Sequence, residues 1–162
     1  LLRLWPRGEA LAVVGDGPQR QKAEEVTSER QLSVRFLSQQ DRQEVDQLMS
    51  KSLGLVFPSK ALEGAPLVYG EAMQAGLPLV AAEGSTLATQ TKADETGMTF
   101  SWSEPGSLDN ALTATRMSRT ALSSQARQVY LDRYTPEAWI DQVTKIYEAA
   151  IADHGRSANP SA

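Results

Sequence analysis

Residues 54–85, which read GLVFPSKALEGAPLVYGEAMQAGLPLVAAEGS, constrain the fold more than any other part of the chain. An apolar run from Leu55 to Phe57 is followed by a loop and by a segment with helical character from about Leu67 to Ala75. Gly76 ends that helix, because glycine is favoured just past a helix end, and a second apolar run from Leu79 to Ala82 follows at once. A strand, a loop, a helix start and a second strand in this order are typical of a ligand-binding edge in α/β proteins.

The same alternation of short apolar runs and longer periodic segments continues along the whole chain. Strands are predicted at 11–14, 34–37, 55–57, 79–82 and 98–102, and helices at 19–28, 42–52, 67–75, 108–119, 121–134 and from Pro136 onward. Strands that are buried on both faces and separated by helices predict an α/β fold with a doubly wound, Rossmann-like parallel sheet. We expect one domain over residues 1–153 and a disordered polar tail at 154–162. Residues 1–5 look like the end of a helix that begins upstream, which indicates a fragment.

Composition argues against several classes of function. The net charge of −4 does not favour a nucleic-acid partner, which calls for clustered lysine and arginine. The chain has no cysteine and a single histidine, His154, so a thiolate metal site and a histidine-based triad are excluded and we expect no metal. No run of about 20 apolar residues is present to span a membrane. Lack of cysteine is compatible with a reducing compartment, and we expect a cytoplasmic protein.

Two glutamates frame the loop and helix start of the most informative segment. Glu71 lies in the first turns of the predicted helix, where the macrodipole favours a carboxylate that can accept hydrogen bonds from a sugar diol. Glu63 lies in the preceding loop, where Gly64 would let a ligand approach the backbone closely. The residues alone leave two interpretations open, a binding site and a pair of surface acids.

Ligands of a doubly wound sheet bind outside the carboxyl ends of its strands. Those ends are predicted at 15–18, 38–40, 58–66 and 83–86. The first of them, Gly15-Asp16-Gly17-Pro18, lacks the spacing of a dinucleotide fingerprint and is equally explained as a turn.

Other conspicuous residues have structural interpretations. Trp139 and Tyr147 share a helical face and are predicted to be core residues, and the charges from Lys22 to Arg30 indicate a solvated helix face. The four arginines between Arg116 and Arg133 are interpreted as a solvated surface, with an anionic partner as the alternative.

The chain resembles the C-terminal, nucleotide-sugar-binding domain of a retaining glycosyltransferase of the family called group 1 or GT4. The matching segments, in family order, are AVVGDGP (12–18), VRFLS (34–38), LVFPS (55–59), EGAPLVYGEAMQAGLPLVAA (63–82), ETG (95–97) and RYTPEAW (133–139). Two glutamates separated by seven residues are the fingerprint, which Glu63 and Glu71 meet. The resemblance implies the C-terminal domain of a GT-B architecture, with its first strand missing from this chain.

The resemblance also implies a role for individual residues. Glu71 would hold the ribose hydroxyls of the nucleotide, and Glu63, at the catalytic position, would hold the donated sugar and orient its anomeric carbon. The remaining donor-binding residues would be Gly64, Ala65, Pro66, Leu67 and Val68 near the sugar and diphosphate, with Gly15, Gly17, Leu37 and Ser38 at the other strand ends.

The implied reaction transfers a sugar from a nucleotide diphosphate sugar, with UDP or GDP as the nucleotide, to a hydroxyl acceptor with retention of configuration. No metal or other cofactor is implied. The acceptor would be bound by an N-terminal domain absent from this chain, so the isolated chain is expected to be inactive. Membrane contact, at the inner face, would come only through that absent domain.

Departures from the family pattern keep two alternatives open. Ser85-Thr86-Leu87-Ala88-Thr89 stands where the family usually has Gly-Gly-x-Pro-Glu, and Ala65 stands where phenylalanine is common. These changes motivate a degenerate homologue that binds a nucleotide sugar or a partner chain without chemistry. A different enzyme on the same architecture, such as a sugar-nucleotide epimerase or a phosphorylase, is the other alternative, against which the glutamate spacing argues.

Overall fold

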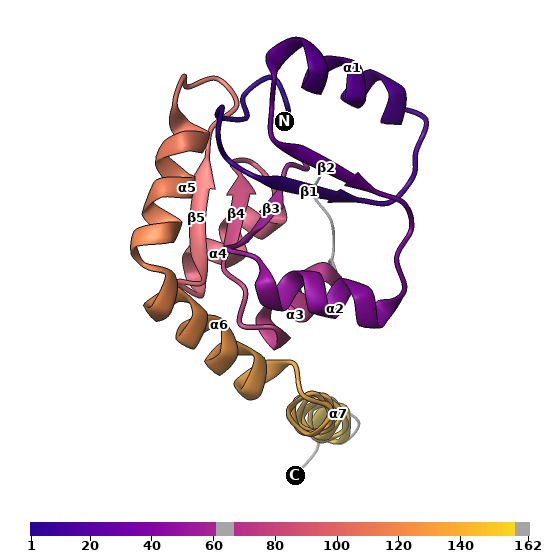
Figure 1. Ribbon diagram of the computed structural model, residues 1–162. Coiled ribbons are helices and arrows are strands. Elements are labelled where there is room, and N and C mark those ends of the chain that lie inside the picture. The colour runs from indigo at the N-terminus through magenta and orange to yellow at the C-terminus, as the bar shows by residue number, and fades with distance from the viewer. Residues whose placement is uncertain (61–66, 158–162) are drawn as a thin grey trace.

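The computed structural model describes residues 1–60 and 67–157, and Figure 1 shows its arrangement. Strands and helices alternate through most of the described residues. The strands are β1 (Leu11–Val14), β2 (Val34–Leu37), β3 (Leu55–Phe57), β4 (Leu79–Ala82) and β5 (Gly97–Phe100). The helices are α1 (Arg20–Arg30), α2 (Arg42–Lys51), α3 (Leu67–Gln74), α4 (Thr86–Ala93), α5 (Ser107–Met117), α6 (Arg119–Arg133) and α7 (Pro136–Ser157).

All strand pairs are parallel, as the sequence predicts, but the strands form two sheets instead of one. β1 pairs with β2, and β3, β4 and β5 form the second sheet in that order. In Figure 1 the arrows of β1 and β2 run crosswise to those of β3–β5. In the doubly wound strand order, the first strand lies between the second and the fourth. The pair β1–β2 and the order β3–β4–β5 are both contained in that order if β1 is counted as its second strand, and the missing first strand stays a prediction.

β4 lies at the centre of the core, and its side chains alternate between two apolar clusters. Leu79 and Ala81 join the cluster formed with α3, α4 and α6 on one face. Val80 and Ala82 join the cluster formed with α5 and Phe100 on the opposite face. Successive side chains of a strand point to opposite faces, so a strand with all four residues buried needs helices on both sides. This double cover is the defining feature of the fold.

α4 is the helix that the sequence did not reveal. Its threonines are weak helix formers, so local propensity does not favour it. The helix is stabilised at its start by Ser85, whose hydroxyl accepts from the Ala88 N–H at 3.1 Å and donates to the Ala82 carbonyl at 2.7 Å. Burial of Leu87 and Ala88 then fixes it against the sheet. Burial and capping together outweigh propensity here.

The described part begins with a turn and ends with a long helix. Residues 1–5 form the turn, in which the Leu4 N–H donates to the Leu1 carbonyl at 2.8 Å. Trp5 is buried there because its indole N–H donates to the Glu9 carbonyl at 2.9 Å and its ring joins the α5 cluster. α7 continues to Ser157, past the predicted start of the polar tail. Residues 158–162 lie outside the described part.

The predicted burial of Trp139 and Tyr147 on α7 is wrong. Trp139 is 60% exposed and Tyr147 is 66% exposed, and Ile140, Ile146 and Ile151 are exposed as well. In Figure 1, α7 is seen end-on and lies apart from the sheets. Helical spacing specifies which residues share a face, but it does not specify what packs against that face. The charged face of α1 is confirmed, because that helix has no buried residue.

No helix in the described ranges is long and apolar enough to cross a membrane.

Gly97 is required where β5 passes β4. A Cβ at this position would lie 1.9 Å from the Leu79 carbonyl oxygen, so the backbone would have to move. We expect Gly97→Ala to lower the free energy of unfolding by about 1–3 kcal/mol or more, as overpacking does in close-packed interiors. Gly17→Ala is the matched control, since a Cβ there meets nothing within 4 Å. Urea unfolding of both variants tests this, and equal stabilities would contradict it.

Candidate functional site

The carboxyl ends of β1 and β2 bring together four of the residues predicted to bind the donor. The Gly15 N–H donates to the Leu37 carbonyl at 3.0 Å, which joins the two strand ends directly. Gly15 has a φ of +108°, a conformation that glycine adopts without the strain other residues would have. Gly17 follows in the same turn, where its carbonyl accepts from the Arg20 N–H at 3.0 Å. Ser38 is next to Leu37 in the second loop.

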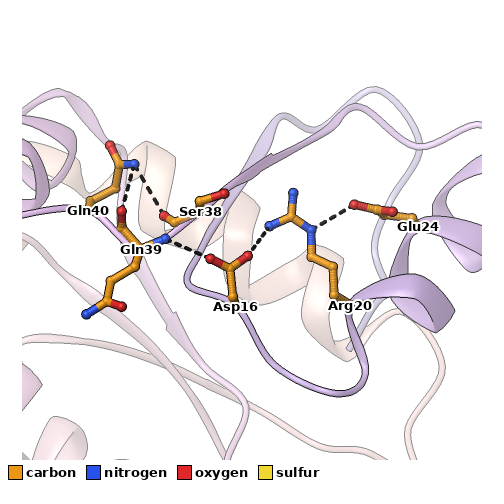
Figure 2. A network of polar contacts seen from close by, with 6 residues as sticks. All are labelled: Asp16, Arg20, Glu24, Ser38, Gln39 and Gln40. Carbon is orange, nitrogen blue, oxygen red and sulfur yellow. Dashed lines mark hydrogen bonds and ion pairs between the residues drawn. The ribbon is translucent and has the colours of Figure 1, made fainter.

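Asp16 fastens these two loops to each other. One carboxylate oxygen accepts from the backbone N–H of Gln39 at 3.1 Å, and the other accepts from the Arg20 guanidinium at 3.0 Å (Figure 2). Arg20 also donates to Glu24 at 2.7 Å. The amide of Gln40 turns back onto the Ser38 carbonyl at 3.3 Å. The rim of the β1–β2 sheet is therefore organised by side chains before any ligand is present.

Glu71 lies on α3, with its side chain 35% exposed. Its Oε1 is 3.5 Å from Nη1 of Arg42, the first residue of α2. This exposed ion pair contributes about 0–1 kcal/mol to stability. Its importance is geometric, because α2 begins just after the loop that leaves β2. The pair therefore links the β1–β2 rim to the helix that carries the predicted ribose-binding acid.

Two of the other predicted residues around α3 lie within the described part of the chain. Glu63, Gly64, Ala65 and Pro66 lie outside the described residues, so convergence of the two glutamates stays a prediction. Leu67 is 84% exposed at the start of α3, and Val68 packs against the α3 cluster. Of the residues expected around the sugar and diphosphate, only these two are placed.

A hollow of about 280 Å³ lies between β2 and α2. It is lined by Arg35, Leu37, Gln40, Glu44, Gln47, Leu48 and Lys51. Leu37 is one of the predicted donor-binding residues and Gln40 lies at the predicted strand end 38–40, but Glu71 does not line the hollow. Small-ligand pockets usually measure about 300–1,000 Å³, so this hollow alone is small for a nucleotide sugar.

Arg116, Arg127 and Arg133 are exposed, as the predicted solvated surface requires, and all four arginines between Arg116 and Arg133 also bind other parts of the fold. Arg116 pairs with Glu9 at 2.6 Å and Arg133 with Asp94 at 2.7 Å. The other two hold the carboxyl end of α3: Arg127 donates to the Gln74 carbonyl at 2.7 Å and Arg119 to the Gly76 carbonyl at 3.1 Å. The helix dipole also favours cations at the carboxyl end of a helix. α6 therefore braces α3 from behind.

A buried polar cluster also holds α3, through Tyr69. The Tyr69 hydroxyl donates to Asp94 at 2.7 Å and lies 3.1 Å from the Thr96 hydroxyl. Asp94 also accepts from Gln90 at 2.6 Å and from Arg133 at 2.7 Å. Burial raises the pKa of Tyr69. Burial would also raise the pKa of Asp94, but the hydrogen bonds from Gln90, Tyr69 and Arg133 outweigh it and hold that pKa below its usual value.

Arg42 and Asp94 are the residues near the candidate site that sequence reasoning missed. Neither stands in a recognisable pattern: Arg42 is one charge on a polar helix, and Asp94 is one acid in a helix-to-strand connection. Their importance comes from contacts between elements distant in sequence. Within the residues that the structure describes, no group of three or more acidic or histidine side chains is placed to hold a metal ion.

The lowered pKa of Asp94 predicts that the free energy of unfolding depends on pH in the acid range. A carboxyl whose folded pKa lies below its unfolded value, about 3.9, contributes stability that is complete above that value and is lost as pH falls through the folded pKa. We expect the free energy of unfolding of the wild type to fall more steeply in acid than that of Asp94→Asn, which cannot titrate there. Urea unfolding between about pH 6 and pH 3 measures both slopes. Parallel slopes would show that Asp94 is not responsible.

Comparisons with solved structures find the same fold in other proteins. WaaG, a glycosyltransferase involved in lipopolysaccharide biosynthesis, is 24% identical with a TM-score of 0.65, over 76% of this chain and 34% of that chain. Sucrose-phosphate synthase from Thermosynechococcus elongatus is 24% identical with a TM-score of 0.67, over 88% and 38%. Anabaena HepE, solved in complex with UDP and glucose, is 21% identical with a TM-score of 0.73, over 89% and 41%.

At these identities the likeness establishes the fold, and the chain spans only 34–41% of the length of those structures. No curated protein matches the sequence significantly. The family model described as "Glycosyl transferases group 1" matches residues 9–129, which is most of the chain and includes both glutamates. The family predicted from the sequence is therefore confirmed: the chain belongs to the group 1 glycosyl transferases.

Proposed function

We propose that this chain is the donor-binding half of a retaining glycosyltransferase, which moves a sugar from a nucleotide diphosphate sugar to a hydroxyl acceptor. The family match over residues 9–129 is the observation that carries the proposal. HepE of Anabaena, which shares the fold, was solved in complexes with UDP and with UDP-glucose. We expect the acceptor to bind in the part of a longer protein that this chain lacks, so the chain binds donor without transferring sugar.

Glu71 is proposed to accept hydrogen bonds from the two ribose hydroxyls. Its half-buried carboxylate lies on α3, and Arg42 pairs with Oε1 through one guanidinium nitrogen. Each charged hydrogen bond of this kind contributes about 1.5–3 kcal/mol. A neutral side chain of the same shape would retain the packing and lose most of that energy.

Glu63 and the loop that follows it are proposed to hold the donated sugar and the diphosphate. The start of α3 offers N–H groups to the phosphates, since the first turn of a helix has unpaired donors and a positive dipole end. Positioning of the anomeric carbon and stabilisation of the departing diphosphate account for the catalytic contribution of this half. Neither step calls for a metal or another cofactor.

Binding of nucleotide should depend on Glu71. We expect the wild-type chain to bind UDP or GDP weakly, and Glu71→Gln to weaken that binding by about tenfold or more, because loss of one charged hydrogen bond corresponds to about 1.5–3 kcal/mol. Calorimetric titration measures both affinities. Glu9→Gln is the matched control, because Glu9 also forms an ion pair with an arginine, Arg116 at 2.6 Å, is 30% exposed, and lies ahead of β1. Equal affinities for the two variants would contradict the assignment of Glu71.

Removal of the Glu63 carboxylate should weaken binding of a nucleotide sugar but not binding of the nucleotide diphosphate alone. We expect Glu63→Gln to weaken binding of the preferred nucleotide sugar, found by screening UDP- and GDP-sugars, while binding of the parent diphosphate stays unchanged. The reason is that Glu63 is assigned to the sugar and Glu71 to the ribose. Competition titrations with the two ligands give the ratio. An equal loss for both ligands would place Glu63 on the nucleotide instead.

A degenerate homologue remains the second candidate, favoured by one observation. Ser85 caps α4 and is buried where the family pattern has flexible glycines, and Thr89 stands where it has a glutamate. Such a homologue would bind a partner chain or a nucleotide sugar without chemistry. The titrations above identify a partner module, which predicts no nucleotide binding in wild type or variant.

A further inference from the structure

Asp94 is buried, with its side chain 2% exposed, and it receives side-chain hydrogen bonds from three different elements. Tyr69 reaches it from α3 at 2.7 Å, Gln90 from α4 at 2.6 Å and Arg133 from α6 at 2.7 Å. The carbonyl of Asp94 also accepts from Gln125 of α6 at 2.9 Å. α3, α4 and α6 therefore converge on this one residue.

Tyr69 fixes the rotation of α3. Residues two apart on an α-helix point about 200° from each other, so Tyr69 and Glu71 lie on nearly opposite sides of the helix. Tyr69 is 3% exposed, and its ring packs edge-on against Tyr134 with centroids 5.8 Å apart. Any roll of α3 would break the Tyr69 hydrogen bond and would carry the Glu71 carboxylate away from its position.

Stability alone is a weak reason for this arrangement. Transfer of a carboxylate from water into the core costs free energy, and the hydrogen bonds from its partners do little more than offset that cost. Apolar residues of similar volume often stabilise a core equally well. A phenylalanine in place of Tyr69 would fill the same volume without burying a hydroxyl. What hydrogen bonds add is direction, because they tolerate little change in angle.

We propose that the Tyr69–Asp94 hydrogen bond is a positioning device for Glu71, which holds α3 at the rotation required for nucleotide binding. This inference rests on the function proposed above, in which Glu71 binds the ribose. Tyr69 and Asp94 act through the helix and do not touch the ligand.

The test compares nucleotide affinities of variants that are fully folded. We expect Tyr69→Phe to weaken binding of the preferred nucleotide by about three- to tenfold, a coupling typical of residues joined through one rigid element. Tyr130→Phe is the matched control, because Tyr130 packs against the same apolar cluster from α6 and its hydroxyl forms no hydrogen bond within the described residues. Urea unfolding in the same buffer establishes that each variant is folded at the titration temperature.

The double variant, Tyr69→Phe with Glu71→Gln, distinguishes a role in positioning Glu71 from a role in stability alone. On a Glu71→Gln background, Tyr69→Phe should cause no further loss, because the group that it positions has already been removed. Equal losses on both backgrounds, or an affinity of Tyr69→Phe equal to that of the control, would overturn the inference while leaving the function of Glu71 intact. If the wild-type chain binds no nucleotide, the proposed function is wrong and the inference fails with it.

Thr96→Val serves if Tyr69→Phe does not fold. The Thr96 hydroxyl lies 3.1 Å from the Tyr69 hydroxyl, and valine preserves its shape. We expect a smaller loss of affinity in the same direction, again absent on the Glu71→Gln background. An unchanged affinity in the folded Thr96→Val variant would then overturn the inference.

Discussion

The complete burial of β4 is the constraint on which the rest of the structure depends. Its four residues, Leu79 to Ala82, are all buried, and alternate side chains enter different apolar clusters. Because neither face can be exposed to water, helices have to cover both, and the connections between parallel strands have to cross over the sheet. The close approach at Gly97 brings β5 against this strand with no room for a side chain. The carboxyl edge, where the loops gather, follows from this packing.

The position of α3 follows from the same packing and connects the core to the candidate site. Ala72 and Met73 are fully buried in the cluster under β4, and two arginines of α6 hold the carboxyl end of the helix. Tyr69 fixes its rotation through Asp94. Glu71 is left on the outer side, within reach of Arg42. The acid proposed to bind ribose is therefore placed by contacts behind the helix and not by contacts around the carboxylate.

Much of the fold could be predicted from the sequence, because apolar runs bounded by turn residues specify buried strands closely. Four strands were predicted with their observed bounds, as was the parallel α/β class. α4 was missed because its cap and burial outweigh weak local propensity. The face of α7 that carries Trp139 and Tyr147 was misjudged, because a sequence pattern identifies which residues share a face, but only tertiary contacts decide what that face meets. The same limit applies to the site, where Glu71 was found by its family fingerprint while Asp94 and Arg42 were not.

The division of the strands into two sheets has a consequence for ligand binding. Gly15 and Leu37 stand on one sheet, while α3 follows the end of a strand of the other, and no backbone ladder in the described part joins the two sheets. A molecule that touches both would bridge two sheets that are held together by side-chain packing, in the cluster that joins Leu11 and Val34 to Val80, and not by backbone hydrogen bonds. Binding of the ligand would then slow amide hydrogen exchange in β1 and β2, including at residues that do not contact the ligand.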